Sequence, residues 1–130
     1  MSLETGLYTA LTGDAGVSAL VGTRIYPEIM PQGVTYPAIS YQRISTTRTN
    51  MLSGVDDFTQ VRVQVDCWDD SYSGVKALSA AVKSAIDGVT ALGTEAVHHC
   101  FMDSERDLSQ FDGDREDRRV SMDFMVYLNE

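Results

Sequence analysis

The chain has 130 residues, of which 43% are hydrophobic and 22% charged, as in one ordinary globular domain, and we expect residues 1–130 to form a single domain. Its formal net charge of −9 makes it a poor candidate for binding phosphate backbones, which needs clustered Lys and Arg. No apolar run approaches the ~20 residues that a membrane-spanning helix needs, so we expect no membrane partner.

Two short helices are predicted at the N-terminus. Ser2 is a suitable N-cap for the first, and Asp14 for a second that stops at Gly22. Their apolar faces are expected at Leu3, Leu7, Tyr8 and Leu11, and at Val17, Leu20 and Val21. The first residues, MSLETGLYTAL, lack the basic region and long apolar core of a signal peptide, so we expect an intracellular site of synthesis. Residues 24–27 form a short extended piece, followed by an irregular Pro- and Gly-containing link over 31–37.

A strand, a polar turn, a second strand and a helix follow. The strands are predicted at 38–45 and 59–68, with TTRTNMLSGVDD between them. The second strand alternates strictly, with Val61, Val63, Val65 and Cys67 on one face and Gln60, Arg62, Gln64 and Asp66 on the other. This pattern is typical of an antiparallel sheet with one covered face. A helix over 72–87, capped at Asp70-Ser71 and stopped by Gly88, supplies the cover with Val75, Leu78, Val82, Ala85 and Ile86.

Two further strands are predicted at 96–102 and 120–128. The segment 103–119 between them has seven acids and four bases, and its composition fits either an extended hairpin or a mobile loop. Residues 1–55 carry no net charge, so the whole charge of −9 lies in residues 56–130. The predicted fold class is α+β, with a four-stranded antiparallel sheet and with the main amphipathic helix and the N-terminal helices packed on one face.

Few residues of the sequence suggest a metal site or a catalytic site. His98 and Cys100 fall on one side of a strand and offer two zinc ligands, but no CxxC or HxxxH spacing accompanies them, so a strand with surface imidazoles is the simpler interpretation. Cys67 continues the apolar face of its strand and is expected to be a core thiol. The two cysteines are expected to be free and half-buried, with a disulfide as the alternative.

Other motifs of catalysis are missing from the sequence. The acidic stretch 112–117 lacks EF-hand spacing, and no GxGxxG, GKS/GKT or GxSxG is present. We therefore expect no enzymatic activity, no catalytic residue, no metal and no cofactor. The segment 46–57 is different, since it combines a positive charge with Met and Leu in a polar context. We expect Arg48, Asn50, Met51 and Leu52 to contact another protein, although a turn without a partner fits the same composition.

An ordered set of segments resembles a known family. These segments are LYTALTGDAGVSALVGTRIYP, PQGVTYPAISY, QVRVQVDCWDDS and GVKALSAAVKSAID, all within residues 7–87. Together they resemble the tail-completion or tail-terminator proteins of long-tailed bacteriophages, prophages and gene transfer agents. The last third of the chain is similar only in kind, as two strands with a charged connection.

The resemblance implies a structural virion assembly protein. It implies a ring, usually of six copies, that caps the head-proximal end of the tail tube, stops tube growth and provides the head-tail joining surface. The implied partners are further copies of the chain, the major tail tube protein and the head-tail connector protein, with the protein in the host cytoplasm during assembly and then in the virion tail. DNA would pass through the ring without specific binding, along a lumen where acids of 103–119 repel phosphate. Pairing between neighbours would cover the exposed sheet edges.

Two alternatives remain open from the sequence. One is another head-tail neck or connector component. The other is a small metal-binding or enzymatic domain that uses His98, Cys100 and nearby acids.

Overall fold

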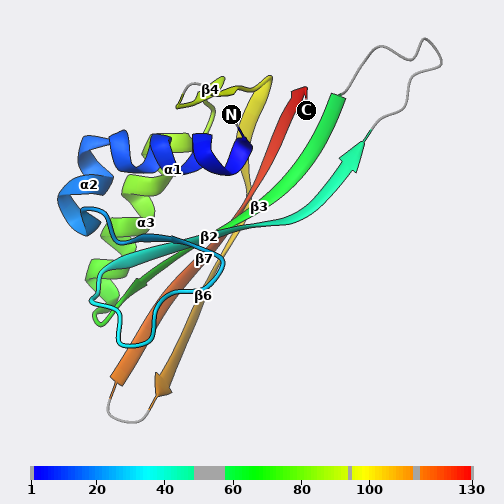
Figure 1. Cartoon of the computed structure of the whole chain (residues 1–130). Helices are drawn as coiled ribbons and strands as arrows, with labels where there is room; N and C mark the ends of the chain where they lie inside the picture. The colour runs from blue at the N-terminus through cyan, green and yellow to red at the C-terminus, as the bar shows by residue number, and fades with distance from the viewer. Residues whose placement is uncertain (1, 49–57, 94, 113–114, 130) are drawn as a thin grey trace.

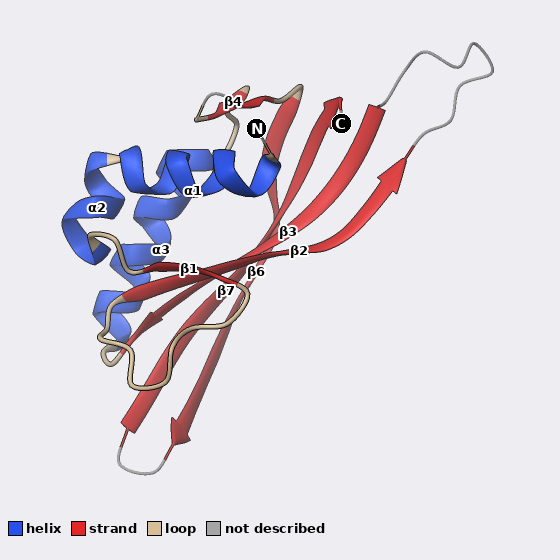
Figure 2. Ribbon diagram, in the orientation of Figure 1, coloured by secondary structure: helices blue, strands red, loops and turns tan. Residues whose placement is uncertain are grey.

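Three helices lie on one face of a five-stranded sheet, so that the protein has two layers (Figures 1 and 2). The computed structural model describes residues 2–48, 58–93, 95–112 and 115–129. The helices are α1 (Leu3–Gly13), α2 (Ala15–Val21) and α3 (Tyr72–Ile86). The strands are β1 (Ile25–Pro27), β2 (Ala38–Arg48), β3 (Phe58–Asp69), β4 (Ala91–Leu92), β5 (Glu95–Ala96), β6 (His99–Asp112) and β7 (Arg115–Asn129).

The main sheet has the strand order β1-β2-β3-β7-β6. The α+β class is confirmed, but the expected four-stranded antiparallel sheet is wrong in detail, because β1 adds a fifth strand that runs parallel to β2. β1 lies within the extended piece expected at 24–27, but its three residues are too few to show the alternation that would predict a strand of the sheet. β4 and β5 form a separate two-stranded sheet that was also not expected.

The predicted helix caps are confirmed. The Thr5 amide donates to Ser2 Oγ at 3.1 Å, and the Val17 amide donates to Asp14 Oδ2 at 3.0 Å. At the start of α3, the Gly74 amide donates to Ser71 Oγ at 3.1 Å. Each bond satisfies an amide that has no partner inside its helix, so these polar residues determine where the helices begin.

The core lies between the helices and the sheet. β3, as predicted, and β7 both contribute alternate residues to it: Val61, Val63, Val65, Cys67, Val120, Met122, Phe124, Val126 and Leu128 are all buried. The helices contribute Leu3, Leu7, Leu11, Val17, Val21, Val75, Leu78, Val82 and Ile86. Tyr8 and Leu20 were expected on apolar faces but are exposed, because only the stripe of each short helix that faces the sheet is covered.

Residues 103–112 and 115–119 belong to an extended pair of strands, β6 and β7. The strands pair from His99 opposite Tyr127 to Asp112 opposite Arg115. β3 ends at Asp69, opposite Arg118, so this pair of strands continues past the end of its neighbour (Figure 1). In the part of the chain that the structure describes, no helix is long and apolar enough to cross a membrane.

Candidate functional site

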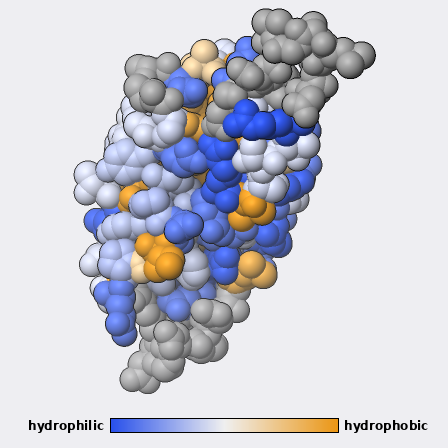
Figure 3. All heavy atoms as spheres, turned by 45° about the vertical axis from the view of Figure 1, so that its right-hand side comes forward, coloured by the Kyte–Doolittle hydropathy of each residue, from blue (hydrophilic) through white to orange (hydrophobic). Residues whose placement is uncertain are grey.

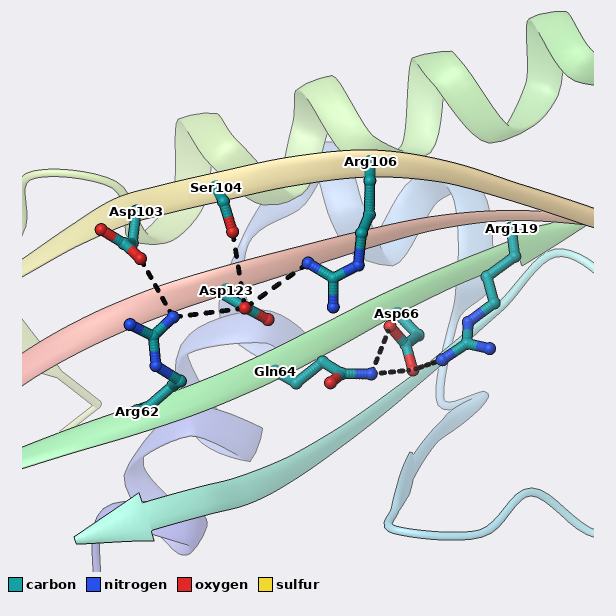
Figure 4. A network of polar contacts seen from close by, with 8 residues as sticks. All are labelled: Arg62, Gln64, Asp66, Asp103, Ser104, Arg106, Arg119 and Asp123. Atoms are coloured by element: carbon teal, nitrogen blue, oxygen red, sulfur yellow. Dashed lines mark hydrogen bonds and ion pairs between the residues drawn. The ribbon is translucent and has the colours of Figure 1, made fainter.

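The face of the sheet that the helices leave uncovered carries a network of charged side chains (Figure 4). Strand alternation places most of these residues together, since every second side chain of β3 and β7 points to this face. In β6, the register shift between Met102 and Ser104 allows the adjacent Asp103 and Ser104 both to join the network. The members drawn in Figure 4 are Arg62, Gln64, Asp66, Asp103, Ser104, Arg106, Arg119 and Asp123.

Asp123 is the centre of one half of the network. Its Oδ2 accepts from Arg62 Nη1 at 3.2 Å, from Ser104 Oγ at 3.4 Å and from Arg106 Nη1 at 3.5 Å. Arg62 also donates to Asp103 Oδ2 at 3.0 Å, and this hydrogen bond is the main reason that the pKa of Arg62 is raised. One arginine therefore joins acids from two different strands.

Asp66 is the centre of the other half. It is 6% exposed and accepts from Gln64 Nε2 at 2.9 Å and from Arg119 Nη2 at 2.9 Å. The Arg119 guanidinium lies 4.9 Å from the centroid of the Trp68 ring, and the Trp68 indole donates to Ser40 Oγ at 3.0 Å. The two halves together cross four strands, from β2 to β6.

The link between β1 and β2 is attached to β7. The Tyr36 hydroxyl donates to Asp117 Oδ1 at 2.7 Å. Asp117 lies on β7, and β2 and β3 lie between β1 and β7 in the sheet, so this bond joins the link to a strand that is distant in the strand order. Arg24 Nε donates to the Pro37 carbonyl at 2.9 Å and attaches the end of the same link. The irregular link expected over 31–37 is therefore fixed to the body of the protein.

The network leaves little free positive charge on this face. Arg62, Arg106 and Arg119 all have carboxylate partners, so a phosphate would have to compete with an ion pair at each of them. The surface in Figure 3, turned toward the side away from the helices, is largely hydrophilic, with hydrophobic side chains in separate small patches. The side chains of this face suit noncovalent contact with another protein.

Acidic side chains of β6 that point toward the helices are also paired. Asp107 accepts from Lys76 Nζ at 2.7 Å and from the Tyr72 hydroxyl at 3.1 Å, and Glu105 lies 3.0 Å from Lys83 Nζ. The hydrogen bond from Lys76 is the main cause of the lowered pKa of Asp107. These pairs were not predicted from the sequence, because the partners are more than twenty residues apart and no local pattern joins them.

The histidines and cysteines do not come together as a metal site. Among the described residues, no group of three or more His, Cys, Asp and Glu side chains is placed to hold a metal ion. His98 lies just before β6 and bonds to Asn129 Oδ1 at 3.1 Å, whereas Cys100 is fully buried. This part of the surface has a hollow of about 320 Å³, lined by Glu95, Ala96, Val97, His98 and Asn129.

The two thiols are free and far apart. Cys67 lies opposite Val120 and Cys100 lies opposite Val126 on the two sides of β7, so they are separated along the strand by about 20 Å. A disulfide needs Cα atoms less than ~7 Å apart, which excludes a bond between them. Both side chains are fully buried rather than half-buried, and burial raises the pKa of each thiol.

The predicted contact residues lie at and beyond one end of β2. Arg48 is the last residue of this strand and is exposed. Asn50, Met51 and Leu52 lie outside the described residues, so the prediction for them stays a prediction.

Comparison with known proteins gives one family and one fold. The family model described as "Tail completion protein gp17" matches residues 5–129. A chain of the solved structure "Virion of native gene transfer agent (GTA) particle" is similar with a TM-score of 0.75 and 20% identity, over 99% of this chain and 96% of that chain. At this identity the structural match shows the fold alone. A search of curated protein sequences finds no significant match.

Proposed function

Because the chain belongs to the tail completion protein family, we propose that it forms a ring that caps the head-proximal end of a phage-type tail tube. The ring, of six copies by the resemblance described above, stops tube growth and offers a surface for joining the head. The observation that carries this proposal is the family match, which covers residues 5–129 and so nearly the whole chain. A structural role in phage-type tails agrees with a site built from ion pairs on a sheet face.

Three kinds of partner follow from this role. They are further copies of the chain, the major tail tube protein and the head-tail connector protein. The segment from Arg48 to Leu52 is the proposed contact with a neighbouring copy or with the tube, because it starts at the exposed end of β2 and combines Arg48 with Met51 and Leu52. The protein acts in the host cytoplasm during assembly and remains in the virion tail.

DNA passes through the proposed ring without specific binding. The net charge of −9 and the paired arginines of the uncovered sheet face both disfavour attachment of phosphate. We place acids of 103–119 along the passage. If this is right, replacing several of them with Lys slows genome ejection from assembled particles, whereas unchanged ejection would remove this segment from the lumen.

Negative-stain microscopy of tail-tube polymerisation, with and without the protein, tests the proposed role. Tubes of limited length with a ring at one end are the expected result. Tubes that grow unchanged and carry no added density would contradict capping. Density bound only to connector preparations would instead identify a neck component.

A further inference from the structure

The hollow beside His98 lies where β5, the start of β6 and the end of β7 meet, at the end of the sheet that carries the C-terminus (Figure 1). Its volume of about 320 Å³ is at the lower end of the range of ligand pockets, so it suits one side chain or one small molecule. The proposed function gives this hollow no role.

The backbone fixes the walls of the hollow. The Val97 amide donates to the Thr90 carbonyl at 3.0 Å, and the His98 amide donates to the Tyr127 carbonyl at 2.6 Å. The His98 Nε2 atom lies 3.1 Å from Asn129 Oδ1, so these two lining side chains hold each other in place. The hollow is therefore preformed, as ligand sites usually are.

The lining of the hollow is acidic. Glu95 contributes a carboxylate, and no Lys or Arg is among the lining residues. Glu95 is half-buried, and none of the described residues forms a hydrogen bond or an ion pair with its carboxylate. The whole net charge of −9 also lies in residues 56–130, which include the hollow. A half-buried carboxylate in such surroundings favours a cationic ligand.

Aromatic rings continue from the hollow onto the uncovered sheet face. His99 follows His98 on β6, and Tyr127 lies two residues before Asn129 on β7. The ring centroids of His99 and Phe101 are 5.2 Å apart, and those of Phe101 and Tyr127 are 5.8 Å apart with planes within 20°. Aromatic rings attract cations through their faces, and the planar guanidinium of Arg also stacks on them.

Other ligands fit this hollow less well. Among the described residues, no three His, Cys, Asp or Glu side chains are placed to hold a metal ion. An anion would meet Glu95 without a basic side chain in the lining, and an apolar group would bury the carboxylate without a partner. Arg62 of the chain itself does not take this place, because its guanidinium bonds to Asp103 and Asp123.

We propose that the hollow is a docking site for an arginine side chain of a partner protein. The Glu95 carboxylate pairs with the guanidinium, and the rings of His99, Phe101 and Tyr127 border it. Arg fits better than Lys, because a guanidinium combines a bidentate ion pair with stacking on a ring. The inference rests on the proposed function for the existence of a partner, and it names one contact by which that partner is bound.

NMR titration of the full chain, labelled with ¹⁵N, tests the site at neutral pH. The probe is N-acetyl-arginine amide, and we expect saturable shifts of amide signals from residues 95–99 and 127–129. The dissociation constant should be on the order of millimolar, as for a small ligand with few contacts. N-acetyl-citrulline amide, which has a similar shape without the charge, should bind several-fold more weakly, and so should N-acetyl-lysine amide.

Two variants separate the charge from the rings. Glu95→Gln keeps the size of the side chain and should weaken arginine binding several-fold. Glu28→Gln is the matched control, since Glu28 is exposed and lies outside the hollow, and it should leave binding unchanged. Phe101→Leu removes the middle ring and should reduce the preference for arginine over lysine. The dispersion of each spectrum shows that the variant is folded.

Equal binding of the arginine and citrulline probes, or binding that E95Q leaves unchanged, would overturn the site. Shifts spread over many surface acids without saturation would do the same, and equal binding of the lysine probe would overturn the assignment to arginine. Tube capping is measured separately on the unsubstituted chain. Probe binding without capping would remove the proposed function and keep this site, whereas capping without probe binding would do the reverse.

Discussion

Gly6 is the point where α1 comes closest to the small β4–β5 sheet. A Cβ atom at Gly6 would lie 2.5 Å from the Leu92 carbonyl oxygen and 2.9 Å from the Glu95 Cβ. The first of these atoms is part of the backbone and the second is bonded directly to it, so neither can rotate away. The helix would therefore have to move. We expect Gly6→Ala to lower the free energy of unfolding by about 1–3 kcal/mol, measured by urea denaturation.

Gly13→Ala is the matched control, at the other end of the same helix. No atom lies within 4 Å of a Cβ placed there, and Ala favours helix over Gly by up to about 1 kcal/mol. The two substitutions should therefore change stability in opposite directions. Equal effects at both positions would mean that the contact with Leu92 does not limit the position of α1.

The thiols of Cys67 and Cys100 should be unreactive in the folded protein. Burial raises the pKa of the Cys100 thiol to about 12 and that of Cys67 further, so almost no thiolate is present at pH 8. We expect Ellman's reagent to react with neither thiol before unfolding and with both in denaturant. Rapid labelling of either residue in the native protein would contradict the packing of the core.

At the scale of elements, α3 and β6 are joined by ion pairs that should make stability depend on pH. The pKa of Asp107 is lowered in the folded protein, chiefly by the hydrogen bond from Lys76. A lowered acid pKa means that the unfolded chain binds the proton more readily. The stabilisation is therefore complete above the unfolded value of about 3.9 and is lost as the pH falls through the lower folded value.

The difference in stability between the unsubstituted protein and Asp107→Asn should thus shrink as the pH is lowered from 6 toward 2.5. Chemical denaturation across this range measures it. In a Lys76→Met background the same substitution should show a much smaller dependence on pH. A constant difference at all pH values would assign the effect of Asp107 to packing.

The charge network of the uncovered face gives a second prediction at this scale. The Asp123 side chain is 14% exposed and accepts from residues of β3 and β6, whereas the Asp103 side chain is 41% exposed and accepts from Arg62. We expect Asp123→Ala to cost about 0.5–1.5 kcal/mol, because it removes the part-buried hydrogen bond from Arg62 together with those from the exposed Ser104 and Arg106. Asp103→Ala should cost less, as exposed ion pairs usually do. Equal losses in urea denaturation would contradict the central place of Asp123.

Local patterns were sufficient to predict most elements. The alternation from Val61 to Cys67 and the caps at Ser2, Asp14 and Ser71 involve residues close in sequence, so the amino-acid order alone is enough to predict them. The extended piece at 24–27 was predicted, but its place in the sheet as β1 was not, because its three residues become a strand only by pairing with Ile39 to Tyr41. The ion pairs Glu105–Lys83 and Asp123–Arg62 depend on the register of the sheet, and short-range sequence patterns do not determine this register.

At the scale of the whole molecule, charge should keep the protein off DNA. With a net charge of −9 and a sequence pI of about 4.5, the unsubstituted chain should not bind a short duplex at physiological salt, as measured by fluorescence anisotropy. Asp66→Asn combined with Asp123→Asn weakens the charge partners of Arg62, Arg106 and Arg119 and should produce detectable binding at low salt. Tight binding by the unsubstituted chain would contradict the proposal that DNA passes through the ring without binding to it.

The strand that comes last in the sequence lies in the middle of the sheet. β7 pairs with β3 on one side and with β6 on the other. β3 and β6 are therefore not connected through the sheet until β7 lies between them. The sheet cannot grow strand by strand in the order of synthesis. Its completion requires contacts between distant parts of the chain, which slows folding and leaves strand edges open in incomplete chains. Folding of the body is therefore cooperative, because β3 and β6 become part of one sheet only when β7 has been inserted between them.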